Sequence, residues 1–530
     1  MQAKYISYRD TNAFSSVVLD YLDRKPELTD FYRYTPDNAG LSEAIVKRNF
    51  RGSRELLVRM LKKQYLPERE ILPAVSSNIA SLADDRTFTV TTGHQLNIFT
   101  GPLYFIYKIV TAINLAAQLK REHPEYNFVP VYWMATEDHD FEEINHLQIE
   151  DRKLTWNKSQ AKGATGRMGT ADIEEVLTAY KGFLGIGENG LKLAEIVEKA
   201  YALHRKLSDA TRSLVNALFG KYGLVCLDAD ESELKQQFAE VVFQDITGEH
   251  SFRNISRSNE ALEELGYKPQ VNPREINFFY MLDELRERIV REGELFKVVN
   301  TEISFTAAEL REELNKHPER FSPNVVMRPL YQELVLPNLA YIGGGAEVVY
   351  WLQLKSNFEH YGVDFPVLLL RNSALVIDRR DETRMHLMGI NYKDLFADTE
   401  TIKNNWVKTH VPLQLALPDE QLAISWIFEQ IKLSAFKIDK TLSVSADTAK
   451  TRTLKMLENL EKKMLRAEKR KHTTSLAQIE KLKERLFPGS GLQERVVNIA
   501  PMYIAYGESF IEGLIATFKP LDREFTVLFA

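Results

Sequence analysis

A histidine follows an apolar run in the segment TTGHQLNIFTGPLYFIYK, residues 91–108. Gly93 lets the chain turn closely there, and His94 and Gln95 come directly after it. A Gly-Pro pair then leads into a helical pattern, and an unpaired helix N-terminus favours phosphate. We therefore expect His94 to be catalytic and to contact a phosphate, with Gly93, Gln95 and Asn97 binding nucleotide or substrate. The alternative is that His94 satisfies only a local backbone group.

A cluster of acids and histidines follows the second apolar run, in MATEDHDFEEINH, residues 134–146. Asp138, His139 and Asp140 could bind a metal, an amine or a sugar hydroxyl, because carboxylate and imidazole groups serve all three. Their spacing does not match the HExxH pattern of zinc hydrolases. We expect these three residues to be catalytic and expect no tightly bound metal, with a purely structural role as the alternative.

Two further acids end a third apolar run, in the sequence LVCLDAD. Asp228 and Asp230 could hold a ribose or an amine at the edge of a sheet, or could form a structural turn. Cys226 lies inside the run, so we expect its thiol to be buried and inert.

A glycine-rich segment, YIGGGAEVVYWLQLK at residues 341–355, precedes a predicted helix. Its glycines would let a ligand approach the backbone closely. A fifth apolar run ends in an arginine that could pair with a carboxylate or phosphate, or form a salt bridge at the edge of the core. Arg274 and Arg328 could likewise read a substrate carboxylate or form structural ion pairs. The residues expected to bind nucleotide or substrate in these two segments are Gly343, Gly344, Gly345, Glu347, Arg371 and Asn372.

These candidate residues all follow short runs of apolar and β-branched residues. Such runs, separated by helical patterns, predict a doubly wound α/β fold with a Rossmann-like parallel sheet. Helical spacing predicts one helix from Leu103 to Ala117, with Lys108 on its surface, and another from Ala346 to His360. The five predicted strands are Phe88–Thr92, Phe128–Ala135, Gly223–Leu227, Leu339–Ile342 and Pro366–Arg371.

The rest of the chain is predicted to be mainly helical. Helices joined by polar turns are expected before residue 85. In the C-terminal third, helical patterns lie on both sides of the sequence SVSAD, where we expect a break with Asp447 as a helix cap. Irregular apolar spacing farther on favours a helical hairpin over a regular coiled coil. The predicted parts are a core over 1–380 with insertions near 141–215 and 231–325, a helical domain over 381–490, and a C-terminal segment over 491–530 that packs back on the body.

The composition excludes several classes of protein. The 530 residues include 68 Lys+Arg and 74 Asp+Glu, and this net charge of −6 provides no overall basic field for nucleic acid. A single cysteine excludes an intrachain disulfide framework. The N-terminus lacks the pattern of a signal peptide, and no stretch approaches the ~18 apolar residues of a membrane span. We expect a soluble cytoplasmic protein that binds neither nucleic acid nor membrane.

Together these segments resemble a family, the bacillithiol-biosynthesis cysteine-adding ligases called BshC. The resemblance implies a Rossmann-type catalytic domain with connecting-peptide insertions, and a C-terminal coiled-coil hairpin that pairs two subunits. It also implies that cysteine is joined to the amino group of glucosaminyl-malate, in the last step of bacillithiol synthesis. The matching stretches are TGHQ with GPLYFIYK, VYWMATEDHDFEEINH, GLVCLDAD, RPLYQELVLPNLAYIGGGAE with YWLQLK, RNSALVID and LFPGSGLQER.

The implied reaction requires activation of cysteine, because a free carboxylate is a poor acyl donor. We expect ATP or another nucleotide to supply it, through an acyl-adenylate or an acyl-phosphate. His94 and the Gly343–Gly345 loop would then contact phosphates. Asp138, Asp140 or Asp228 would hold amines or sugar hydroxyls. Two other functions fit the residues: a metal-dependent hydrolase or deacetylase using the histidine and aspartate cluster, and a non-enzymatic scaffold built on the helical hairpin.

Overall fold

The computed structural model is built around one sheet of five parallel strands. Their spatial order is β13-β12-β2-β3-β6, so strands are added first on one side of β2 and then on the other. This arrangement confirms the predicted doubly wound core. The strands are β2 (Thr87–His94), β3 (Asn127–Met134), β6 (Val225–Asp228), β12 (Asn338–Gly343) and β13 (Val367–Leu370). The structure describes residues 1–68, 71–149, 152–158, 161–411 and 416–530.

Both faces of this central sheet are buried under helices, which explains why its strands read as continuous apolar runs. Val131 of β3 belongs to a cluster that includes residues of α14 (Arg328–Val335). Its neighbour Tyr132 points to the opposite face and joins a cluster with α5 (Leu103–Glu122). Cys226 is fully buried in that second cluster, as predicted.

Two helix predictions in the core need correction. Lys108 was expected on the surface of its helix, yet its side chain is only 5% exposed, because both the sheet and a second helix cover it. The helix expected over 346–360 is divided into α15 (Gly345–Leu352) and α16 (Lys355–Tyr361). Gln353 lies at the break between these two helices. Its buried side-chain amide forms hydrogen bonds with backbone groups of the predicted insertion near 231–325.

Two long segments interrupt the core where the sequence predicts insertions. The first contains a β-hairpin and four helices, namely α6 (Phe141–Ile144), β4 (His146–Ile149), β5 (Arg152–Thr155), α7 (Glu174–Leu184), α8 (Glu188–Leu203) and α9 (Leu207–Phe219). The second contains helices and an antiparallel sheet, namely α10 (Ser232–Gln236), α11 (Ala239–Gly248), α12 (His250–Glu264), β7 (Phe278–Leu282), β8 (Leu285–Glu292), β9 (Leu295–Val298), β10 (Ser304–Phe305), α13 (Ala307–Lys316) and β11 (Phe321–Pro323).

The two ends of the chain meet in a separate three-stranded sheet that the sequence pattern does not predict. The chain begins with β1 (Gln2–Ser7), so the expectation of helices alone before residue 85 is wrong. β1 pairs antiparallel with β15 (Glu524–Phe529), and β15 pairs parallel with β14 (Ala374–Ile377). The helices that follow β1 are α1 (Ser16–Leu22), α2 (Asn38–Lys47), α3 (Arg54–Gln64) and α4 (Pro73–Ser81).

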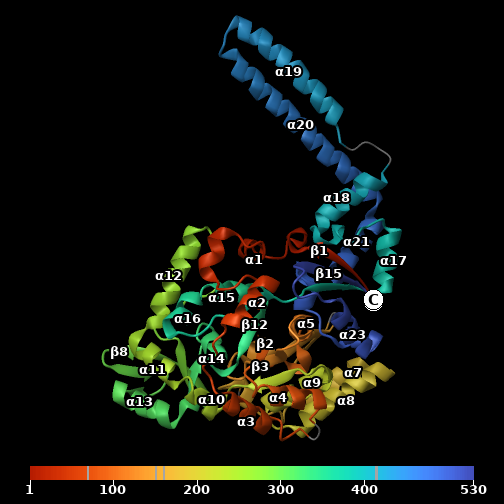
Figure 1. Cartoon of the computed structure of the whole chain (residues 1–530). Helices are drawn as coiled ribbons and strands as arrows, with labels where there is room; N and C mark the ends of the chain where they lie inside the picture. Colours follow the sequence, from red (N-terminus) through yellow and green to blue (C-terminus); the bar gives the residue numbers. More distant parts are fainter. Residues whose placement is uncertain (69–70, 150–151, 159–160, 412–415) are drawn as a thin grey trace.

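The C-terminal part is helical and includes a long hairpin that projects away from the body (Figure 1). The hairpin turns at 439–441, where Asp439 accepts hydrogen bonds from Thr441, and the predicted break at SVSAD is wrong. Asp447 caps no helix; it lies inside α20 and pairs with Lys432 at 2.7 Å. No helix in the described ranges is long and apolar enough to cross a membrane. The helices of this part are α17 (Arg379–Leu387), α18 (Thr399–His410), α19 (Pro418–Ile438), α20 (Leu442–Lys471), α21 (Thr473–Leu486), α22 (Ala500–Tyr506) and α23 (Glu508–Thr517).

Candidate active site

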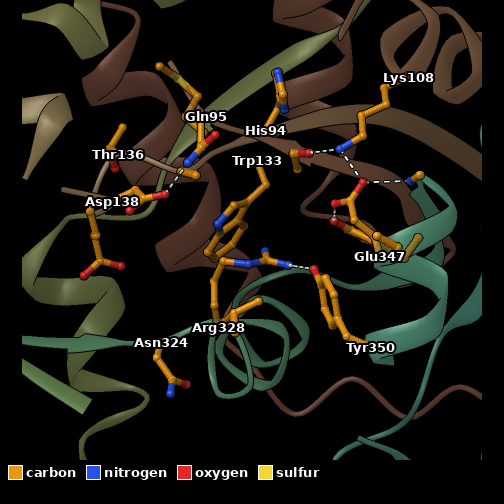
Figure 2. Close-up of a pocket in the computed structure, with 18 of the residues that line it drawn as sticks. His94, Gln95, Lys108, Trp133, Thr136, Asp138, Asn324, Arg328, Glu347 and Tyr350 are labelled. Carbon is orange, nitrogen blue, oxygen red and sulfur yellow. Dashed lines mark hydrogen bonds and ion pairs between the residues drawn. The ribbon is translucent and has the colours of Figure 1, made fainter. Parts of the chain in front are cut away.

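A cavity of about 790 Å³ lies at the carboxyl edge of the central sheet. The ends of β2, β3 and β12 form one wall, the start of α15 forms another, and the second insertion covers it. Open α/β sheets bind ligands where the order of strands reverses, and β2 and β12 flank that point here. Figure 2 shows Trp133 between two polar groups, one at Gln95 and Asp138 and the other at Lys108 and Glu347.

The cavity brings together residues from separate predicted segments. One set comes from the strand end and loop after β2, a second from the acidic segment after β3, and a third from the glycine-rich loop before α15. Convergence of segments so far apart in sequence favours a single site. The predicted residues that line the cavity are Gly93, His94, Gln95, Asp138, Arg328, Gly344, Gly345, Glu347 and Arg371.

The other predicted residues do not line the cavity. Asp230 accepts two hydrogen bonds from Arg167, at 2.6 and 2.9 Å, in a structural ion pair. Asp228 accepts a hydrogen bond of 2.5 Å from the Thr136 hydroxyl, and Thr136 itself lines the cavity. Asp228 therefore lies behind the wall and supports it. The remaining predicted residues outside the wall are Asn97, His139, Asp140, Gly343 and Asn372.

His94 presents a neutral imidazole at the end of β2. Its ring stacks on Phe105 with centroids 5.0 Å apart. Burial, together with the positive charges of Lys108 and Arg371, holds the pKa of His94 well below its usual range. Its Nε2 is buried and has no hydrogen-bond partner among the described residues. Buried polar atoms are normally paired, so an unpaired nitrogen on a residue that lines the cavity makes His94 a candidate contact for a ligand.

The depressed pKa of His94 predicts a pH dependence of stability. Below pH ~6.5 the unfolded chain takes up a proton at this residue that the folded chain does not. The free energy of unfolding should therefore fall by up to about 1.4 kcal/mol per pH unit as the pH drops below that value. Urea unfolding of the wild type and of His94→Asn between pH 5 and 7.5 measures this, and the variant should show the shallower slope. Equal slopes would contradict a neutral His94.

Lys108 and Glu347 form the central ion pair of the cavity wall. Lys108 Nζ lies 2.5 Å from a Glu347 carboxylate oxygen and donates to the Gly93 carbonyl at 2.8 Å. Glu347 also accepts hydrogen bonds from the Gly344 N–H at 2.7 Å and the Tyr341 hydroxyl at 2.8 Å. Burial acts to raise the pKa of Glu347, but Lys108 and these donors outweigh it and lower that pKa. The pair ties the end of β2 to the glycine-rich loop.

Three arginines that line the cavity have no carboxylate partner among the described residues: Arg286, Arg328 and the exposed Arg495. Arg328 donates to Gln332 at 3.0 Å and lies 3.5 Å from the Tyr350 hydroxyl. Arg286 donates to Ser322, to the Pro323 carbonyl and to the His139 ring, and its guanidinium packs on Phe279. Arg286 and Arg328 line the cavity, and neither forms a salt bridge within the described ranges. Guanidinium groups that are bonded to no carboxylate suit an anionic ligand. Arg274, the other arginine singled out in the sequence, is exposed and does not line the cavity.

Arg371 differs from these arginines because its charge is already compensated. Its guanidinium lies 2.7 Å from Glu494, and both side chains are buried. It also donates to the Ser373 hydroxyl at 3.0 Å. Arg371 therefore connects the cavity to the C-terminal part of the chain, although it contributes positive field to the wall.

Asp138 is held on the opposite side of the cavity. Its oxygens accept hydrogen bonds from Gln95 at 2.6 Å and from the His139 N–H at 2.8 Å. Gln95 donates to Glu143 as well, at 2.8 Å. Burial acts to raise the pKa of Asp138, but His139, Gln95 and Arg286 outweigh it and hold that pKa well below its usual range. Asp138 is thus an ionised, well-bonded acid.

Several wall residues were not singled out in the sequence. Glu137 belongs to the acidic segment, but the predicted catalytic residues were its neighbours Asp138, His139 and Asp140. Arg286 lies in a strand that reads LRERIVRE, and this alternation of charge gives no signal for a buried site. The main residues missed are Lys108, Trp133, Thr136, Glu137, Arg286, Asn324 and Tyr350.

The residues that could hold a metal are not grouped. In the described parts of the chain, no three His, Cys, Asp or Glu side chains gather as a potential metal site. His94 also stacks against aromatic rings, and Asp138 is occupied by amide donors. The arrangement therefore does not favour the metal-dependent hydrolase among the predicted functions.

Two family models together match nearly the whole chain. One, "Bacillithiol biosynthesis BshC, N-terminal Rossmann-like domain", matches residues 1–372, and the other, "Bacillithiol biosynthesis BshC, C-terminal coiled-coil domain", matches residues 374–530. The chain is 43% identical to a protein of Flavobacterium psychrophilum, over 100% of this chain and 99% of that one. It is 42% identical to a protein of Flavobacterium johnsoniae, over 100% of both. Each relative is named "Putative cysteine ligase BshC".

Proposed function

The chain belongs to the BshC family of bacillithiol biosynthesis, and from that premise we propose that it joins L-cysteine to glucosaminyl-malate. The amide forms between the cysteine carboxyl and the amino group of the sugar, in the last step of bacillithiol synthesis. The relatives are named cysteine ligases, which supports cysteine as the acyl donor. ATP or another nucleotide serves as co-substrate, and the cytoplasm is the compartment that supplies it.

The main support for this proposal is the positive charge of the arginines that line the cavity. Arg286 and Arg328 line it without a bonded carboxylate among the described residues, and His94, whose buried Nε2 has no partner among those residues, belongs to the same wall. Malate contributes two carboxylates to the acceptor, and a nucleotide contributes phosphates. Such anions would supply the partners that the arginines lack. A scaffold protein has no need of uncompensated buried charge, whereas an enzyme for anionic substrates does.

The reaction proceeds in two steps that conserve atoms and charge. The cysteine carboxylate first attacks a phosphorus atom of the nucleotide. It forms an acyl-adenylate with release of pyrophosphate, or an acyl-phosphate with release of the nucleoside diphosphate. The sugar amine then attacks the acyl carbon, its nitrogen loses a proton, the C–O bond to the phosphate breaks, and the phosphate oxygen keeps the electron pair. His94 and the Gly344–Gly345 backbone contact the phosphates in this scheme.

The direct test supplies the purified protein with cysteine, glucosaminyl-malate and one nucleotide at a time. Mass spectrometry follows the amide product and the nucleotide product. We expect amide formation only with cysteine and a nucleotide together, with AMP marking the adenylate route and ADP the acyl-phosphate route. Serine in place of cysteine is the control for the acyl donor. Absence of product with every nucleotide would contradict the proposed function, and product without any nucleotide would contradict nucleotide activation.

We further propose that the α19–α20 hairpin pairs two copies of the chain. No residue of α19 is buried, and its exposed apolar residues include Trp426, Ile431 and Phe436. Apolar surface of this extent marks a contact with another protein surface. Sedimentation should give the mass of two chains for the wild type and of one for Trp426→Ser/Ile431→Ser, with Lys437→Ser as the polar control. A monomeric wild type would contradict the pairing.

A further inference from the structure

Two neighbouring acids, Glu137 and Asp138, line the cavity beyond the end of β3, but their surroundings differ. Asp138 accepts hydrogen bonds from Gln95 and from two backbone N–H groups, so its oxygens are well satisfied. The Glu137 side chain is 12% exposed, and its Oε1 forms an ion pair with Lys235. No described residue donates a hydrogen bond to its other carboxylate oxygen, Oε2. Glu137 is therefore the acid with unused bonding capacity.

The ion pair with Lys235 compensates Glu137 only in part. Lys235 Nζ is buried and also lies 3.2 Å from Asp230, and it donates to the Glu319 carbonyl at 3.2 Å. Its single charge is thus shared between two carboxylates. Asp230 has a second cation, Arg167, bound through two hydrogen bonds. Of the two acids that share Lys235, Glu137 is the less stabilised as an anion.

The pKa values of Glu137 and Asp138 are therefore shifted in opposite directions. Burial raises the pKa of Glu137, and Lys235 opposes this shift without cancelling it. The pKa of Asp138, in contrast, is held well below its usual range. In many active sites, two acids with different pKa values have different catalytic roles. The acid with the higher pKa is the one that accepts the proton. Asp138 then serves to orient its neighbours.

We propose that Glu137 is the general base of the ligation step, a role that rests on the proposed function. As the sugar nitrogen bonds to the acyl carbon, the Glu137 carboxylate takes a proton from that nitrogen. The phosphate leaves with the electron pair of the C–O bond, and the open cavity lets Glu137 return its proton to solvent. The earlier activation of cysteine involves no proton removal from an amine, so that step does not use Glu137.

The test compares two acceptors in the same protein. Hydroxylamine is uncharged at neutral pH and is a strong nucleophile that reacts with activated acyl groups in solution, where its nitrogen loses a proton to water without an enzymatic base. The sugar amine is the acceptor whose proton Glu137 is proposed to remove. Glu137→Gln should form cysteine hydroxamate and cleave nucleotide at rates within about threefold of the wild type. Its rate of amide formation with glucosaminyl-malate should fall about 10²–10⁴-fold, the usual contribution of a general base. Glu142→Gln, which alters an exposed acid in the same segment, is the matched control.

The hydroxamate reaction also shows that the variant is folded and able to activate cysteine. Amide formation by Glu137→Gln near the wild-type rate would overturn the role of Glu137. An equal loss of hydroxamate and amide would overturn it too, because Glu137 would then act in folding or in activation. Failure of the wild type to cleave nucleotide or form hydroxamate would instead contradict the proposed function itself.

Discussion

Replacement of Arg328 with methionine should lower kcat/KM for amide formation by at least about 30-fold. Arg328 lies in the cavity wall without a carboxylate partner among the described residues, so its charge is available to a substrate anion. Loss of a desolvated charged hydrogen-bonding partner costs about 2–5 kcal/mol of binding, and about 1.4 kcal/mol corresponds to a factor of ten. Steady-state kinetics with each of the three substrates varied in turn will show which KM depends on Arg328.

The same substitution should not destabilise the protein. Arg328 forms no ion pair among the described residues, so the melting temperature of Arg328→Met should stay close to that of the wild type. Arg274→Met is the matched control, because Arg274 was an equal candidate from sequence but is exposed outside the cavity. Its kinetics should stay within twofold of the wild type. A falling melting temperature with unchanged kcat/KM in Arg328→Met would show a structural role instead.

Replacement of Lys108 with methionine should lower the free energy of unfolding by about 3–5 kcal/mol, the usual cost of removing one member of a buried ion pair. Glu347 would keep its hydrogen bonds from Gly344 and Tyr341 but lose its only counter-ion within the described ranges, and the Gly93 carbonyl would lose its donor. Urea unfolding monitored by circular dichroism measures the change.

A double variant separates the ion pair from the packing of Lys108. Lys108→Met/Glu347→Leu removes both charges and replaces them with apolar side chains, so it should recover at least 2 kcal/mol relative to Lys108→Met alone. Activity should not recover in the double variant, because Glu347 also holds the Gly344 backbone that lines the cavity. Additive losses in the two single variants and the double variant would contradict a direct coupling between Lys108 and Glu347.

The central sheet could be predicted because its strands are buried on both faces. Each strand then reads as one continuous apolar run, as FVPVYWMA does for β3, and the helix after β2 repeats its apolar residues at helical spacing. β1 offered no such signal, since only Ile6 of its six residues is fully buried and its partner β15 lies at the other end of the chain. The hairpin turn was misplaced because Asp439–Thr441 contains no glycine or proline to mark it.

The candidate site was predicted in part, for the same physical reason. Carboxyl ends of parallel strands meet at one edge, so His94, Asp138 and the glycine-rich loop could be expected to lie together. Ion pairs with residues from distant segments could not be predicted, because the local sequence contains no signal for them. Lys108 looked like a surface residue because its counter-ion, Glu347, comes from a distant segment of the chain. Asp230 looked like a ligand because nothing in its own segment indicates Arg167.

The most direct test of cysteine activation follows the carboxyl oxygens. The protein is given cysteine labelled with ¹⁸O in its carboxyl group, together with glucosaminyl-malate and ATP, and mass spectrometry locates the label. The proposed activation predicts that one ¹⁸O per amide formed appears in AMP, for the adenylate route, or in inorganic phosphate, for the acyl-phosphate route. Amide formation with no label in either AMP or phosphate would contradict the account, because the cysteine carboxylate would then never have bonded to phosphorus.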